Sequence, residues 1–102
     1  MIVFIDSDGS STLTEAEHFE AFKVLVHQAV SEDELSTALS TLGERDGNHA
    51  WISVAELRQF RNVRDDALWQ NSLTAMISKA AKNGWTDPDR KLIKAHIERL
   101  DK

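Results

Sequence analysis

The sequence contains no cysteine, and this absence excludes disulfide bonds, thiolate metal sites and cysteine nucleophiles. No apolar run approaches the roughly 18 residues that a membrane-spanning helix needs, so we expect no association with a membrane. The apolar start of the chain, Met1 to Ile5, is too short for a signal peptide, and no basic residue precedes it. The default location is therefore the cytoplasm.

An excess of positive charge is also missing. The 12 lysines and arginines are outnumbered by 17 aspartates and glutamates, which gives a formal net charge of −5. Because a nucleic-acid-binding surface usually needs an excess of lysine and arginine, we expect no nucleic acid as a partner. A cation or another protein is a more natural partner for an acidic chain.

The composition that remains is that of a small folded protein. The chain has 102 residues, of which 41 % are apolar, and this suits one domain with one modest core. We therefore predict a single domain over residues 1–102, present as a monomer or a homodimer.

Capping signals and helical spacing predict an all-α fold of about five helices. A serine or threonine followed three residues later by glutamate is a capping box, which satisfies free amides at a helix N-terminus. This pattern begins at Thr14, Ser31 and Ser53. The helix that follows Ser31 would end at Gly43, because glycine commonly terminates helices.

Two further helices are predicted in the C-terminal third. Asp65 or Asp66 would start one helix that ends at Asn83-Gly84, and Thr86 would cap the last. The apolar stripes of the five expected helices are formed by Phe19, Phe22, Val26, Val30, Leu35, Leu39, Leu42, Leu57, Phe60, Trp69, Leu73, Met76, Ile77, Leu92, Ile93, Ile97 and Leu100.

A polar segment over residues 6–17, DSDGSSTLTEAE, has the spacing of a cation-binding loop. Calcium takes six to eight oxygen ligands, and a twelve-residue loop can supply them from positions 1, 3, 5, 7, 9 and 12. Counted from the first aspartate, every one of these positions carries an oxygen donor. The six candidate ligands are Asp6, Asp8, Ser10, the carbonyl of Thr12, Thr14 and Glu17.

This segment resembles the calcium-binding loop of the EF-hand family, of the calmodulin type. Leu13 occupies the position of the apolar anchor, and the resemblance implies that Ca²⁺ binds at about 10⁻⁵–10⁻³ M. The segment departs from the family at Ser11, where the loop normally has glycine. It also departs in the five residues before Asp6, which leave no room for a full first helix.

A second segment, ERDGNHAWISVAE at residues 44–56, resembles the same loop with one residue inserted. Its ligands would be Glu44, Asp46, Asn48 and Glu56, in a site that is weak or lost. Because EF-hands work in pairs, the resemblance implies an antiparallel bridge between Leu13 and Ile52. It further implies an EF-hand-like pair over residues 1–62 and a two-helix extension over residues 63–102 that packs on this pair.

The predicted function is therefore a calcium-binding EF-hand-like module with a structural or protein-interaction role. One alternative is a metal-free helical interaction protein, in which the aspartates of the first loop only cap a turn. Another alternative rests on IVFIDSDGSST, which resembles the start of a haloacid-dehalogenase-type phosphatase. Asp6 would then be the nucleophile and Asp8 the acid, with Asp65-Asp66 as a later acidic pair. That fold needs a parallel sheet, and no strand is evident after residue 5, so we expect no enzyme.

Overall fold

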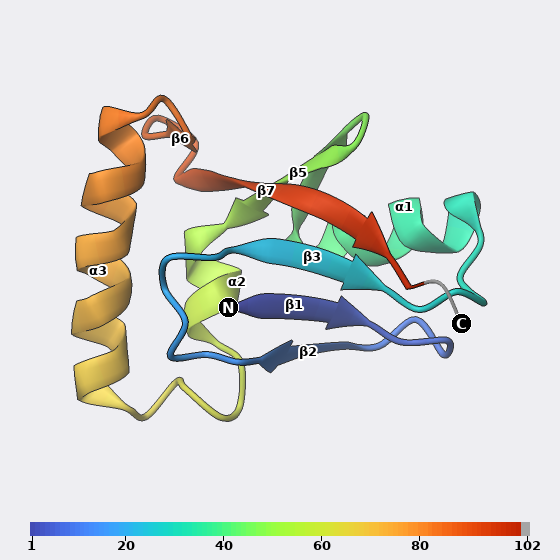
Figure 1. Cartoon of the computed structure of the whole chain (residues 1–102), viewed down its shortest axis with the longest axis horizontal. Coiled ribbons are helices and arrows are strands. Elements are labelled where there is room, and N and C mark those ends of the chain that lie inside the picture. The colour runs from blue at the N-terminus through green and yellow to red at the C-terminus, as the bar shows by residue number, and fades with distance from the viewer. Residues whose placement is uncertain (101–102) are drawn as a thin grey trace.

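The structure, a computed structural model, describes residues 1–100 and has a mixed α/β fold in which strands form a single sheet (Figure 1). In chain order its elements are β1 (Ile2–Ile5), β2 (Ser11–Thr14), β3 (Lys23–Val26), α1 (Glu32–Leu42), β4 (Gly43–Asp46), β5 (His49–Ser53), α2 (Val54–Arg58), α3 (Ala67–Lys82), β6 (Thr86–Asp87) and β7 (Leu92–Arg99). The predicted all-α fold is therefore wrong, and so is the EF-hand-like helix pair on which it was based.

The sheet has the strand order β2-β1-β3-β7-β5-β4, and β6 pairs with β7 outside this path. The three neighbouring strands β1, β3 and β7 run parallel to one another, whereas the remaining pairs are antiparallel. β7 is thus a central strand, and it joins the N-terminal half of the sheet to the β4–β5 hairpin.

One face of the sheet carries the core. Val3, Val24 and Val26 are completely buried there, as are Ala50 and Ile52 on β5. Figure 1 shows α1 and α2 behind this face, while α3 crosses the end of the sheet where β1 and β3 begin. No helix formed by residues 1–100 covers the opposite face, and we call it the open face.

The first and the last of the five expected helices are strands instead. Buried apolar and exposed polar side chains alternate along these segments, or their residues pair with neighbouring strands of the sheet. Thr14 does not cap a helix but lies in β2, opposite Ile2 of β1. The segment expected as the helix that follows Thr14 instead contains β3, whose Val24 and Val26 are both buried in the core. The last expected helix is β7, in which buried Ile93 and Ala95 alternate with polar residues. Residues 101 and 102 of the predicted extension lie outside the described residues.

The other helices are confirmed, together with their caps. Ser31 and Glu34 form both hydrogen bonds of the capping box at the start of α1, at 3.1 and 2.9 Å. Ser53 caps α2, and Asp66 caps α3. Local sequence controls these starts, because each cap satisfies amides only three residues away. Within the described residues, no helix is both long and apolar enough to span a bilayer.

Candidate binding groove

A groove of about 430 Å³ lies between α3 and the edge of the sheet. It arises because β3 and β6 pair with different parts of β7. One side of β7 pairs with β5, so β3 and β6 must both pair along its other side. β6 pairs at Leu92 and Ile93, and β3 pairs only from His96 onward. The two strands diverge between these points, and the C-terminal half of α3 spans the opening.

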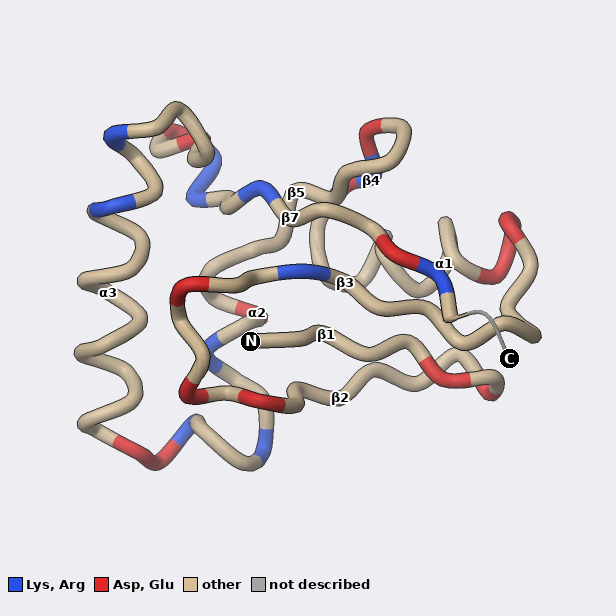
Figure 2. The backbone as a smooth tube through the Cα atoms, viewed as in Figure 1, with Lys and Arg blue, Asp and Glu red and all other residues tan. Residues whose placement is uncertain are grey.

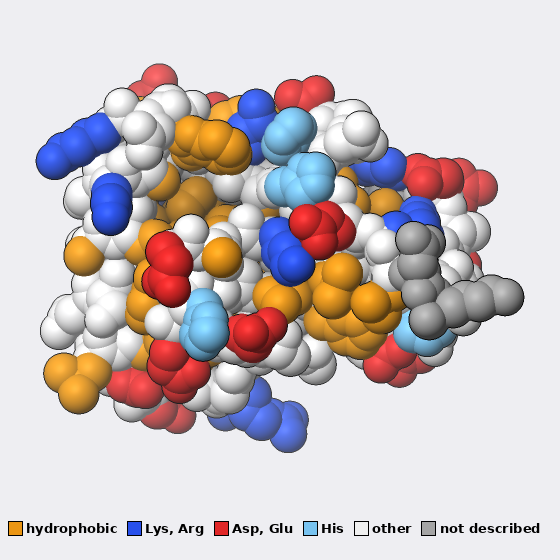
Figure 3. Space-filling model, viewed as in Figure 1, with side chains coloured by type: hydrophobic (Ala, Val, Ile, Leu, Met, Phe, Trp, Pro, Cys, Tyr) orange, Lys and Arg blue, Asp and Glu red, His pale blue; other side chains and the backbone are white. Residues whose placement is uncertain are grey.

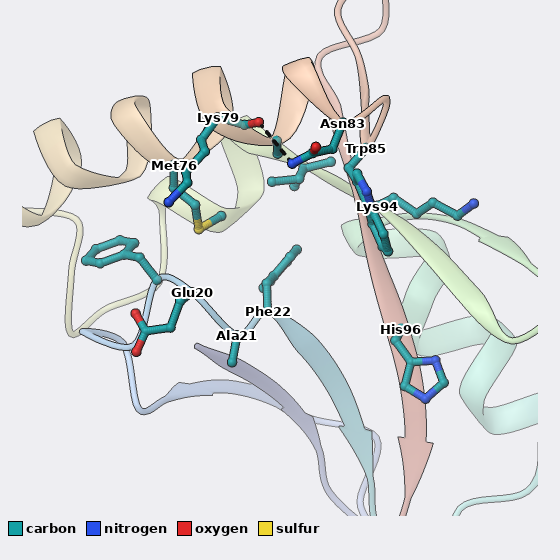
Figure 4. A pocket seen from close by; sticks show the side chains of 12 residues that line it. Glu20, Ala21, Phe22, Met76, Lys79, Asn83, Trp85, Lys94 and His96 are labelled. Carbon is teal, nitrogen blue, oxygen red and sulfur yellow. Dashed lines mark hydrogen bonds between the residues drawn. The ribbon is translucent and has the colours of Figure 1, made fainter.

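The interior of the groove is mainly apolar and aromatic. Figure 4 shows Phe22 and Met76 pointing into it from opposite sides, with Trp85 forming one end. Trp85 is 45 % exposed, although tryptophan side chains are on average highly buried. The apolar lining comes from Phe19, Phe22, Met76, Ala80, Trp85 and Ile93. A hollow of this volume and composition can hold a small organic ligand or a few apolar side chains.

The charged groups lie at the rim. Lys79 extends from α3 toward the β2–β3 loop, which carries Glu20 (Figure 4). At the other end Lys94 leaves the groove, and its ammonium lies 5.7 Å from the centre of the Trp51 ring. His96 faces His49 across the strands, with ring centres 5.8 Å apart. An apolar interior with charges of both signs at its rim suits a ligand that is itself apolar with polar flanks.

The walls of the groove differ in how firmly they are held. Trp69 and Leu73 bury the N-terminal half of α3, and the Trp69 indole donates a 2.8 Å hydrogen bond to the carbonyl of Ala16. The β2–β3 loop is held by the amine of Met1, which donates to the carbonyls of His18 and Ala21 at 2.6 and 2.7 Å. In the C-terminal half of α3, by contrast, no residue is fully buried. The groove thus opens beside the less firmly packed half of the helix.

A second hollow, of about 350 Å³, lies on the other side of α3. Its walls come from α2, α3 and the turn between β6 and β7, and they include Ile77, Pro88 and Leu92. No aromatic side chain lines it. The first groove is therefore the better candidate for recognition of an apolar partner.

The predicted calcium ligands Asp6, Asp8 and Ser10 form the tight turn between β1 and β2. The Asp6 amide donates to the Ser10 carbonyl at 2.9 Å, and the Ser10 amide donates to the Asp8 carboxylate at 2.9 Å. Hydrogen bonding from Ser10 holds the pKa of Asp8 below its ordinary value of 3.8. These carboxylates cap their own turn, as the alternative interpretation of this segment expected.

The remaining ligands of the first loop lie away from the turn. Thr12 and Thr14 belong to β2, which places Thr14 beside Ile2 at the far end of the hairpin. A strand of four residues spans roughly 13 Å, and Glu17 comes after it. The structure therefore separates Glu17 from Asp6, and the EF-hand resemblance of this segment is wrong.

The second predicted loop is a β-hairpin followed by a helix. Glu44 and Asp46 lie in β4, Asn48 lies in the turn, and Glu56 lies in α2. Glu44 accepts a 2.8 Å hydrogen bond from Arg90 rather than joining the other three. Two-residue turns such as this one connect adjacent antiparallel strands.

The predicted bridge between Leu13 and Ile52 is also wrong. Leu13 pairs with Val3, whereas Ile52 pairs with Gly43 and Ile93. The sheet order places β1, β3 and β7 between the two strands that carry Leu13 and Ile52.

No metal centre is visible in residues 1–100, where no three histidine, aspartate or glutamate side chains are placed so that they could hold an ion. Calcium binding in solution stays a prediction.

The residues of the phosphatase interpretation are not brought together either. β1 does lie parallel to β3, but a hairpin rather than a helix follows it. Asp66 caps α3 by accepting from the amide of Trp69, and Trp69 contacts Ala16 beyond the end of β2. The length of β2 therefore separates Asp66 from Asp6.

The comparisons with known proteins give no identification. The sequence matches no protein-family model, and neither the curated proteins nor the solved structures that were searched contain a match. The class that the structure itself defines is a mixed α/β domain with one open sheet face and an apolar groove.

The residues that line the groove were assigned to the wrong elements by sequence reasoning. Phe19 and Phe22 were expected on a helix, and His96 on another. A signal for the correct assignment was present at Ile93–Glu98, where apolar and polar residues strictly alternate, as half-buried strands do. Nothing in the sequence indicates that Phe22 and Trp85 line the same groove, because only the pairing of β3 and β6 with β7 places them there.

Proposed function

We propose that this protein is a protein-interaction domain and that the groove beside α3 binds apolar side chains of a partner segment. The observation that carries the proposal is the lining of the groove. Phenylalanine, methionine and tryptophan are enriched in the cores of protein interfaces, and Phe22, Met76 and Trp85 converge here around a hollow of about 430 Å³.

The arrangement of charge supports a partner that is apolar at its centre and charged at its flanks. Lys79 and Glu20 lie on opposite walls of the groove (Figure 4). Rim charges steer association and fix the orientation of a bound segment more than they add affinity. Apolar contacts with Met76 and Phe22 would then supply most of the binding free energy. The unbranched side chain of Met76 can adapt to partners of different shape.

The test is a selection of binding peptides, followed by affinity measurements on matched variants. A displayed library of random twelve-residue peptides is selected on the wild-type protein, and the enriched peptides are titrated by calorimetry. Ala80→Glu places a carboxylate on the groove wall, and Ala75→Glu places the same group on the exposed side of α3. We expect Ala80→Glu to weaken binding at least ten-fold and Ala75→Glu to leave it unchanged.

Trp85→Ala is a second test variant, because its exposed side chain can be removed with little effect on folding. It should also weaken binding by removing one end of the groove. The proposal fails if the selected peptides bind both test variants as tightly as the wild type. It also fails if no peptide is enriched. Circular dichroism of each variant shows whether a loss of affinity reflects unfolding.

A further inference from the structure

The open face of the sheet has a composition that its position in the fold does not explain. Parallel strands are usually buried on both faces, and β1, β3 and β7 are parallel. β1 and β3 read as nearly continuous apolar runs, IVFI and KVLV. The side chains that alternate with the core valines, Ile2, Phe4 and Leu25, therefore point to the face that no helix covers.

The register of the strands shows how these side chains are arranged. Phe4 lies directly opposite Leu25, with Thr12 beyond it on β2 and Glu98 beyond Leu25 on β7. Ile2 lies opposite Lys23 in the next row. We call the three apolar residues Ile2, Phe4 and Leu25 the sheet patch. Figure 3 shows an apolar surface over β1 and β3, apart from the groove beside α3.

From this arrangement we propose that a second copy of this chain covers the sheet patch, so that the protein forms a symmetric dimer through its open sheet face. The groove beside α3 adjoins the open face, but Ile2, Phe4 and Leu25 are not among the residues that line it, so this inference does not depend on the proposed function.

The electrostatics of the open face fit a second copy. On the three parallel strands the charged residues of this face are Lys23, Lys94 and Glu98, which sum to +1, although the chain as a whole carries −5. Figure 2 shows nearly all of the acidic residues outside these strands, in turns, in α1 and in β4. Two copies can therefore approach through the part of this face that these three strands form without bringing acidic surfaces together, whereas Glu44 and Asp46 lie on the same face at β4.

The ion pair beside the sheet patch is self-complementary. Lys23 and Glu98 are 3.0 Å apart, and their side chains are 34 % and 45 % exposed. The hydrogen bond from Lys23 holds the pKa of Glu98 below its ordinary value of 4.5, so this group is ionised at neutral pH. In a two-fold symmetric contact the same patch meets itself, so Lys23 of one copy can approach Glu98 of the other.

The dimensions of the molecule limit the size of such a contact. The two longer dimensions are 34 and 26 Å, and Figure 1 views the molecule along the third. The outline of the molecule in this view is therefore at most roughly 900 Å², and the open face shares it with α3, so the contact lies at the small end of the range around the ~800 Å² per partner of a standard protein interface. Two sheets packed face to face, about 10 Å apart, are a common arrangement in β-sandwiches.

The experiment is analytical ultracentrifugation of the wild type and of matched variants between 1 and 200 μM. Leu25→Glu puts a charge in the sheet patch, and Leu68→Glu puts the same charge on α3, where Leu68 is 80 % exposed. We expect the wild type and Leu68→Glu to dimerise, and the dissociation constant of Leu25→Glu to rise at least thirty-fold. Circular dichroism establishes that each variant is folded.

A charge exchange keeps the proposal testable if Leu25→Glu does not fold. Lys23→Glu should weaken the dimer at least five-fold, and the double variant Lys23→Glu with Glu98→Lys should restore it. A wild type that stays monomeric at 200 μM overturns the proposal and leaves the sheet patch to a different protein. A dimer that survives Leu25→Glu or Lys23→Glu unchanged overturns it as well.

Discussion

Removal of the Trp69 side chain is the most informative single change in this fold. Trp69 is only 5 % exposed and belongs to the first turn of α3, the helix that forms one wall of the groove. Its ring lies 5.8 Å from that of Phe19, and its indole nitrogen donates to the carbonyl of Ala16 at 2.8 Å. The Trp69 side chain thus connects α3 to the segment that follows β2, by an aromatic contact and a hydrogen bond.

The structure sets the size of the effect. Truncation of a buried tryptophan to alanine costs about 3–5 kcal/mol, from lost apolar contact and the cavity left behind. Trp69→Phe should cost less, about 1–3 kcal/mol, because it keeps an aromatic ring but leaves the Ala16 carbonyl without its donor. Trp85→Ala is the control, and since Trp85 is 45 % exposed it should cost less than about 1 kcal/mol.

The measurement is urea unfolding followed by far-ultraviolet circular dichroism, with the free energy of unfolding extrapolated to water. We expect the order of destabilisation to be Trp69→Ala, then Trp69→Phe, then Trp85→Ala. If Trp69→Ala costs no more than Trp85→Ala, then Trp69 does not anchor α3 and this account of how the groove wall is held is refuted.

Three other predictions follow from particular contacts. Gly43→Ala should destabilise the fold by at least about 2 kcal/mol in the same assay, since a Cβ atom there would lie 1.8 Å from the carbonyl oxygen of Trp51. An unchanged midpoint of urea unfolding would contradict the β4–β5 register. Ser31→Ala should cost about 0.5–2 kcal/mol by removing the side-chain half of the capping box, and Ser31→Asp, which can still cap, is its control. Hydrogen bonding from Arg45 lowers the pKa of Glu32 from its ordinary value of 4.5, so this stabilisation is present above about pH 4.5 and is lost as pH falls through the lowered value. Glu32→Gln should therefore lower the melting temperature at pH 7 and reduce its fall from pH 5 to pH 3; an identical pH profile would rule out this contribution.

Chain segments whose structure depends on near neighbours were predictable from the sequence. The starts of α1, α2 and α3 are confirmed, because a cap residue binds amides within one helical turn of itself. The two-residue turn Gly47-Asn48 had a recognisable hairpin signal, and Ile93 to Glu98 had the alternation of a strand. Both signals were present, and both were outweighed by the resemblance to a calcium-binding loop.

Where the local sequence is consistent with both a helix and a strand, only the tertiary structure decides between them. Thr14 and Glu17 have the spacing of a capping box, but the pairing of Thr14 with Ile2 extends the chain as a strand instead. Strand pairing joins residues far apart in sequence, such as Lys23 with His96, and no local pattern specifies it. The same long-range pairing makes β3 and β6 share one side of β7, and so it creates the groove between Phe22 and Trp85.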